Sequence, residues 1–178
     1  MGATREDAIM NARDSILAAI RAAAVPAAPA AQIPSTPVEH ADGLHDAFFQ
    51  VLTDVGGQGV IRAESQAMDA LLADLLGPAQ PDAVVLRGRF AVAENAAVYV
   101  DAADLSARND IVRAEHLVVI VPFSAIVPTM HEAMRLMPAD SGCGWFLSGP
   151  SKTADIEQSL VFGAQGSRTH RVIFDRGT

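Results

Sequence analysis

Apolar residues recur along this chain with two spacings, which together predict alternating helices and strands. Helical spacing, with an apolar residue at every third or fourth position, covers residues 4–24, 44–55 and 65–76. Compact apolar runs predict strands at residues 59–63, 83–86, 90–100, 117–121, 145–147 and 172–174. The run at 117–121 is almost wholly apolar, which is typical of a parallel strand buried on both faces. Two further helices are expected at about residues 128–137 and 154–162.

This alternation predicts an α/β fold with an open, mostly parallel sheet and flanking helices, because right-handed strand–helix–strand connections are the economical topology. Residues 1–25 are expected to form a separate amphipathic helix that ends where prolines begin. Residues 26–41 are rich in alanine and proline, which suits an extended linker. The α/β domain is therefore expected to span residues 42–178.

Charge and composition narrow the classes of function. The chain has 178 residues, enough for one sizeable core, and a formal charge of −8 from 21 acidic and 13 basic residues. Such a field repels nucleic-acid phosphates and anionic membranes, so neither is an expected partner. An anionic ligand would need a local positive charge.

Cysteine and histidine usage argues against a metal centre. Cys143 is the only cysteine, and the five histidines show no ligand spacing, so we expect no metal and no bound cofactor. His131-Glu132 begins like a zinc-protease motif, but Arg135 stands where the second histidine belongs. With no disulfide and no apolar stretch long enough to span a bilayer, a cytoplasmic location is expected.

The segment from Ser148 to Glu157, Ser-Gly-Pro-Ser-Lys-Thr-Ala-Asp-Ile-Glu, lies between a predicted strand and a predicted helix. In an open α/β sheet that position is the carboxyl edge, where ligands collect. Gly149 permits an unusual turn, N–H groups of the first helical turn can face an anion, and Lys152 adds positive charge. The candidate anion-binding residues are Ser148, Gly149, Ser151, Lys152, Thr153 and Asp155.

Local pattern alone leaves this segment open to a simpler interpretation. Its serine, threonine and aspartate residues can cap the helix while Lys152 is solvated, and the local pattern favours that alternative. A nucleotide-binding P-loop is excluded, because Pro150 stands where the lysine of that motif belongs.

Residues 148–157 resemble the Ser-Gly-Pro-Ser-[Lys/Arg]-Thr-Ala-Asp-Ile-Glu signature of the LUD-domain family, the C-subunit family of bacterial lactate-utilisation proteins. Residues 118–136 are similar to the family's strand-and-helix segment, and the resemblance runs from about Leu44 to the end. It implies a fold related to sugar-phosphate isomerases and CoA transferases. It also implies a role beside two iron–sulfur partner subunits in oxidising lactate to pyruvate, with the clusters held elsewhere than in this single-cysteine chain.

A second family segment, Ala-Glu-Thr-Gly-Thr, corresponds to residues 93–97, of which only Ala93 and Glu94 match. The resemblance makes Glu94 a candidate catalytic nucleophile or base, similar to the glutamate of CoA transferases. Ala96 and Ala97 replace the family's glycine and threonine.

Three functions stay open, and whether the chain is an enzyme stays open with them. The first is a lactate-oxidation subunit whose anion pocket faces Glu94. The second is a CoA-transferase-like or sugar-phosphate-binding enzyme. The third is a non-catalytic assembly module that docks a partner through its N-terminal helix.

Overall fold

The computed structural model describes residues 5–23, 43–77, 83–105, 110–137, 143–153 and 161–177. Two compact units are present, residues 1–35 and residues 36–178. The first contains helix α1 (Arg5–Ala22), and the predicted linker at residues 26–41 lies outside the described residues. No helix in the described ranges has both the length and the apolar character needed to cross a membrane.

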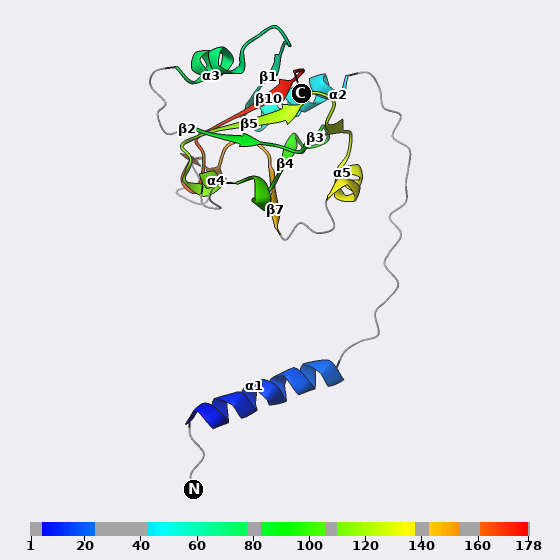
Figure 1. Ribbon diagram of the computed structural model, residues 1–178, viewed down its shortest axis with the longest axis vertical. Helices are drawn as coiled ribbons and strands as arrows, with labels where there is room; N and C mark the ends of the chain where they lie inside the picture. Colours follow the sequence, from blue (N-terminus) through cyan, green and yellow to red (C-terminus); the bar gives the residue numbers. More distant parts are fainter. Residues whose placement is uncertain are drawn as a thin grey trace. The chain divides into compact units, whose positions relative to one another are not determined.

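The second unit is built on a parallel sheet of four strands in the order β1-β10-β5-β2 (Figure 1). These strands are β1 (Gln58–Arg62), β10 (Thr169–Asp175), β5 (His116–Pro122) and β2 (Ala83–Arg87), and every pairing between them is parallel. The predicted α/β class with a mostly parallel central sheet is therefore confirmed. The last strand in sequence, β10, is an inner strand of this sheet.

A second, smaller sheet was not predicted. Its strand order is β6-β3-β4-β7, with β6 (Ile126–Val127), β3 (Phe90–Val92), β4 (Ala97–Asp101) and β7 (Gly144–Leu147). The apolar stretch at residues 90–100 is a hairpin, because a four-residue turn separates β3 from β4. β7 pairs antiparallel with β4 and takes no part in the parallel sheet.

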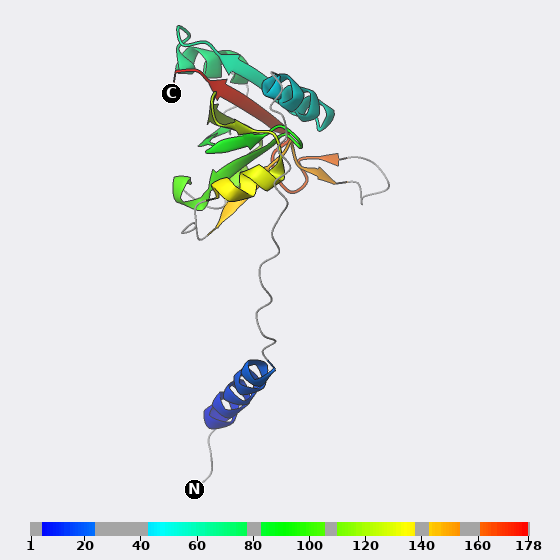
Figure 2. The same ribbon diagram turned by 90° about the vertical axis from the view of Figure 1, so that its right-hand side faces the viewer.

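The core forms between the two sheets. Alternate residues of the parallel strands, including Leu117, Val172 and Phe174, face the second sheet and helix α2 (Leu44–Asp54). The opposite face of the parallel sheet is covered by α3 (Met68–Leu76), and the far face of the second sheet by α5 (Met130–Leu136). Figure 2 shows α3 and the yellow α5 on opposite sides of the red strand β10.

The prediction of a helix at residues 154–162 is wrong for the last two residues. Val161 and Phe162 form strand β9 (Val161–Phe162), which pairs antiparallel with β8 (Lys152–Thr153), and residues 154–160 lie outside the described residues. Figure 2 shows the two strands as an orange ribbon. Valine, phenylalanine and threonine favour strands, and the pairs Lys152–Phe162 and Thr153–Val161 override the helical spacing. Two short elements, η1 (Ala102–Asp104) and α4 (Asp110–Arg113), complete the unit.

Candidate functional site

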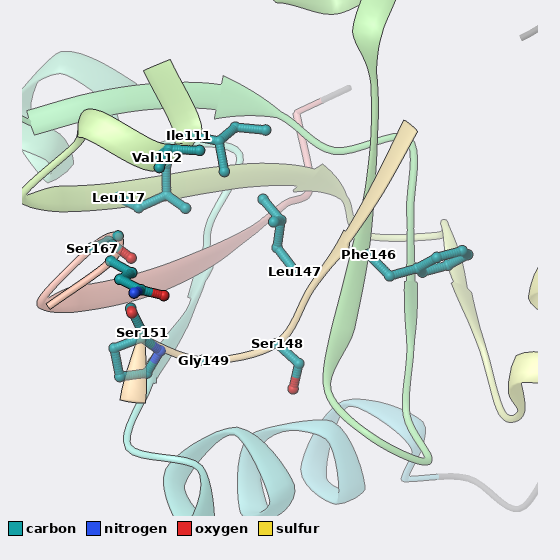
Figure 3. A pocket seen from close by; sticks show the side chains of 12 residues that line it. Ile111, Val112, Leu117, Phe146, Leu147, Ser148, Gly149, Ser151 and Ser167 are labelled. Atoms are coloured by element: carbon teal, nitrogen blue, oxygen red, sulfur yellow. The ribbon is translucent and has the colours of Figure 1, made fainter. Parts of the chain in front are cut away.

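A cavity of about 270 Å³ lies beside the segment with the LUD-family signature (Figure 3). One side is apolar and is formed by Ile111, Val112, Leu117, Phe146 and Leu147. The other side is formed by two loops, residues 148–151 and residues 165–167. Because three serines belong to these loops, we call this cavity the serine pocket.

Backbone hydrogen bonds hold the two loops together. The Ser151 N–H donates to the Ser167 carbonyl over 2.8 Å, and the Gly163 N–H donates to the Ser151 carbonyl over 2.9 Å. The Ser148 hydroxyl donates to the Asn95 carbonyl over 2.7 Å and points away from the other two serines (Figure 3). Within the described residues, the hydroxyls of Ser151 and Ser167 have no hydrogen-bond partner, so they are available to a ligand.

Gly149 is required by its neighbours. Its φ of 71° lies in the left-handed region, which favours glycine. A Cβ atom at this position would lie 2.8 Å from Val55 Cγ2 and 2.9 Å from the Val55 carbonyl oxygen, at the end of α2. The glycine therefore lets the loop approach α2 closely.

The serine pocket lies at the edge of the parallel sheet opposite to the one expected. Leu117 is the second residue of β5, and Ser167 comes just before β10, so the pocket adjoins the amino ends of these strands. The prediction placed the signature segment at the carboxyl edge because it assigned residues 145–147 to the parallel sheet. Since β7 belongs to the second sheet, the loop after it emerges elsewhere.

Lys152 lies next to the pocket and does not line it. Its side chain is exposed, and Nζ is 5.6 Å from the centre of the Phe162 ring. A Cβ added at Gly56 would come within 3.5 Å of Lys152 Cε, which places the side chain beside the end of α2. Thr153 is also absent from the described lining, and Asp155 lies outside the described residues. Of the six predicted anion-binding residues, the pocket brings together Ser148, Gly149 and Ser151.

Glu94 has a structural partner. It is exposed, and its Oε2 accepts a hydrogen bond from the N–H of Met130, the first residue of α5, over 2.9 Å. A carboxylate at a helix N-terminus is favourable, because the N–H groups there are otherwise unpaired. Glu94 does not line the serine pocket; its neighbour Asn95 contacts Ser148. Ala96, at the position of the family's glycine, has a φ of 52°.

His170 is a buried residue near Gly149 that the sequence pattern was not used to predict, and it does not line the serine pocket. It is 1% exposed on β10 and is paired in register with Leu117, so both side chains lie on the same face of the sheet. Within the described residues neither ring nitrogen has a hydrogen-bond partner. Burial lowers the pKa of His170, while the nearby Gly149 backbone opposes that shift without reaching hydrogen-bond geometry. The period-two alternation with Val172 and Phe174 was the signal that could have placed it inside.

No group of three or more histidine, cysteine, aspartate or glutamate residues in the described ranges could hold a metal ion. Cys143, just before β7, is exposed.

Comparison with known proteins decides the family. The model of the LUD domain family matches residues 79–174, which include both loops of the serine pocket. The chain belongs to the LUD domain family.

Relatives of this LUD-domain chain include lactate utilization protein C 1 of Bacillus mycoides, 37% identical over 92 residues, or 47% of this chain and 39% of that protein. Lactate utilization protein C of Halalkalibacterium halodurans is 32% identical over 94 residues, or 49% of this chain and 41% of that protein. The chain thus matches about two fifths of the length of these relatives. The crystal structure of a DUF162 family protein from Deinococcus radiodurans has the same fold, with a TM-score of 0.50 and 16% identity over 74% of this chain and 96% of that one.

The capping role of Glu94 in the LUD domain predicts a stability effect. Glu94→Ala removes the acceptor for the Met130 N–H, and the expected loss is about 0.5–1 kcal/mol in the free energy of unfolding, as for other helix caps. Urea denaturation measures it. The control is Glu64→Ala, which removes an exposed glutamate in the turn after β1. Equal stability of Glu94→Ala and the wild type would contradict the capping role.

Burial of neutral His170 predicts a pH dependence of stability. Because its pKa is lowered in the folded protein, the unfolded chain binds more protons at acidic pH, so stability rises with pH. The contribution of His170 is fully present above the ordinary histidine pKa of 6.5 and is lost as the pH falls below it. Urea denaturation at pH values from 7.5 to 5 should show that the free energy of unfolding falls less steeply in His170→Gln than in the wild type. Exposed His131→Gln is the control, and parallel curves for all three proteins would show that buried His170 does not cause the pH dependence.

Proposed function

We propose that this LUD-domain chain takes part in lactate utilisation by binding a small carboxylate in the serine pocket. The observation that carries the proposal is that the loop with the family signature forms one wall of this pocket. Relatives named for lactate utilisation support the choice of lactate, and of its oxidation product pyruvate, as the first candidates.

The pocket offers groups for both ends of such a molecule. The hydroxyls of Ser151 and Ser167 can donate to carboxylate oxygens, while Leu117 and Leu147 can contact a methyl group. No lysine or arginine is among the described lining residues, so Lys152 acts in this proposal only as a nearby charge. Figure 3 shows Leu117 next to Ser167, with Ser151 close by, while the ring of Phe146 points away from them.

The proposal extends to partners. Oxidation of lactate to pyruvate releases two electrons and two protons, and the resemblance to lactate-utilisation C subunits implies that iron–sulfur partner subunits accept the electrons. This chain would bind the carboxylate beside them. The transferase alternative has less support, because the carboxylate of Glu94 caps α5 outside the serine pocket.

Titration of the protein with lactate and pyruvate, followed by NMR, tests the pocket. Ser151→Ala and Ser167→Ala should each weaken binding by about 0.5–1.5 kcal/mol, the contribution of one hydrogen bond. Lys152→Ala should weaken it less than either serine variant, because Lys152 lies against Phe162 outside the pocket. The control is Ser65→Ala, an exposed serine in the turn before α3.

Two outcomes contradict the proposal. One is unchanged binding in both serine variants. The other is a loss confined to Lys152→Ala, which would move the anion to the β8–β9 ribbon.

A second candidate function, assembly with a partner chain, is favoured by the surface of α1. Ile16 and Ile20, four residues apart on one helical face, are 60% and 62% exposed. Large apolar side chains repeated on one exposed helix face are typical of a surface that binds another protein. We propose that residues 1–41 serve this docking and that the α/β domain folds without them.

Truncation tests this division of the chain. A variant that begins at residue 42 should keep the thermal stability of the α/β domain, because its core residues follow that point. The control begins at residue 56 and lacks Phe48 and Leu52 of α2, which are both fully buried, so it should unfold. A large fall in Tm for the first variant would show that residues 1–41 belong to the domain.

A further inference from the structure

A larger cavity, of about 470 Å³, lies where the parallel strand β5 ends. Its lining consists of Leu44, His45, Phe123, Ser124, Ile126, Val127, Pro128 and Glu132, none of which lines the serine pocket. These residues come from the start of α2, the turn after β5, strand β6 and the first turn of α5. Carboxyl ends of parallel strands are where α/β folds commonly bind ligands. We call this the His45 cavity.

The imidazole of His45 is held in one orientation. It stacks on Phe123 with ring centres 4.1 Å apart and an interplanar angle of 7°. It also meets the Phe174 ring edge-on, with centres 4.7 Å apart. Its Nε2 lies 3.0 Å from the Phe123 carbonyl oxygen. Two ring contacts and one hydrogen bond therefore fix the plane and the direction of the ring.

This orientation determines which nitrogen is free. A carbonyl oxygen only accepts, so Nε2 must carry the proton of the hydrogen bond. In the neutral ring Nδ1 is then an acceptor. Nδ1 has no hydrogen-bond partner within the part of the chain that the structure describes. His45 thus brings one acceptor nitrogen to the lining of the cavity, on a ring whose contacts hold its orientation.

The remaining walls define the ligand further. They are mainly apolar, from Leu44, Phe123, Ile126 and Val127, which suits an apolar body. Such walls disfavour a charged ligand, because burying a charge among apolar side chains is costly. We propose that the His45 cavity is a binding site for a small uncharged molecule with an apolar body and one O–H or N–H group, which donates to His45 Nδ1. This site goes beyond the proposed function and does not depend on it.

A pair of probes tests the hydrogen bond directly. Phenol has an apolar ring and one O–H donor, and anisole has the same ring with that oxygen methylated. Both are titrated into the full-length protein with ¹⁵N-labelled histidine, and NMR follows the His45 ring. Phenol should shift the Nδ1 resonance of His45 and bind about two- to tenfold more tightly than anisole, the range for one neutral hydrogen bond. Equal affinities, or no response at His45, would overturn the proposal.

Two variants complete the test. His45→Phe keeps a ring to stack on Phe123 and removes the acceptor, so it should bind phenol and anisole equally. His131→Gln changes an exposed histidine outside the cavity and should keep the preference for phenol. Persistence of the preference in His45→Phe would overturn the proposal. If His45→Phe does not fold, the comparison of the two probes on the wild type still decides.

The variant Ser167→Ala should also keep the preference for phenol, because the serine pocket and the His45 cavity share no lining residue. Weaker lactate binding with an intact phenol preference would thus separate the two sites. A lost phenol preference in Ser167→Ala would contradict a separate site.

Discussion

The last strand of the chain is an inner strand of the parallel sheet, and the rest of the domain depends on its insertion. β10 pairs with β1 on one side and β5 on the other, and Val172, Ile173 and Phe174 are fully buried. Until β10 is in place, β1 has no neighbour in the sheet. The C-terminal segment therefore joins the first and middle parts of the domain into one core.

A buried ion pair also connects β1 and β10 at their carboxyl ends. Arg62 at the end of β1 donates from Nε to Asp175 at the end of β10 over 2.6 Å, and both residues are buried. Because an unpaired buried charge is costly, each residue holds the other strand in register. At the opposite ends, the same insertion places residues 165–167 against the loop of residues 148–151 and forms the serine pocket.

The second sheet determines where the signature loop emerges. β7 runs antiparallel to β4, and a Cβ at Gly144 would clash with the Tyr99 hydroxyl oxygen, so the strand needs glycine to pass the buried tyrosine. The loop after β7 consequently meets α2 at Val55 and the start of β10. The two cavities thus lie at opposite ends of β5, one with serine hydroxyls and one with an oriented imidazole.

The sequence was sufficient to predict those features whose signal is a local pattern or a family motif. The apolar run of β5 predicted a buried parallel strand, and the signature loop does line a cavity. It was insufficient where pairing between distant segments determines the structure. The pattern of β7 does not show which sheet it joins, and the residues of β9 have helical spacing but pair with β8. His45 and Phe123 are 78 residues apart, so no local pattern could bring them together.

We propose that the loop of the family signature binds a small carboxylate between Ser151 and Ser167. A crystal structure of the protein grown with pyruvate tests it most directly. We expect electron density for the carboxylate within hydrogen-bond distance of both serine hydroxyls, with the methyl group toward Leu117 and Leu147. Density for pyruvate beside Lys152 and Phe162, with the serine pocket containing only water, would contradict it.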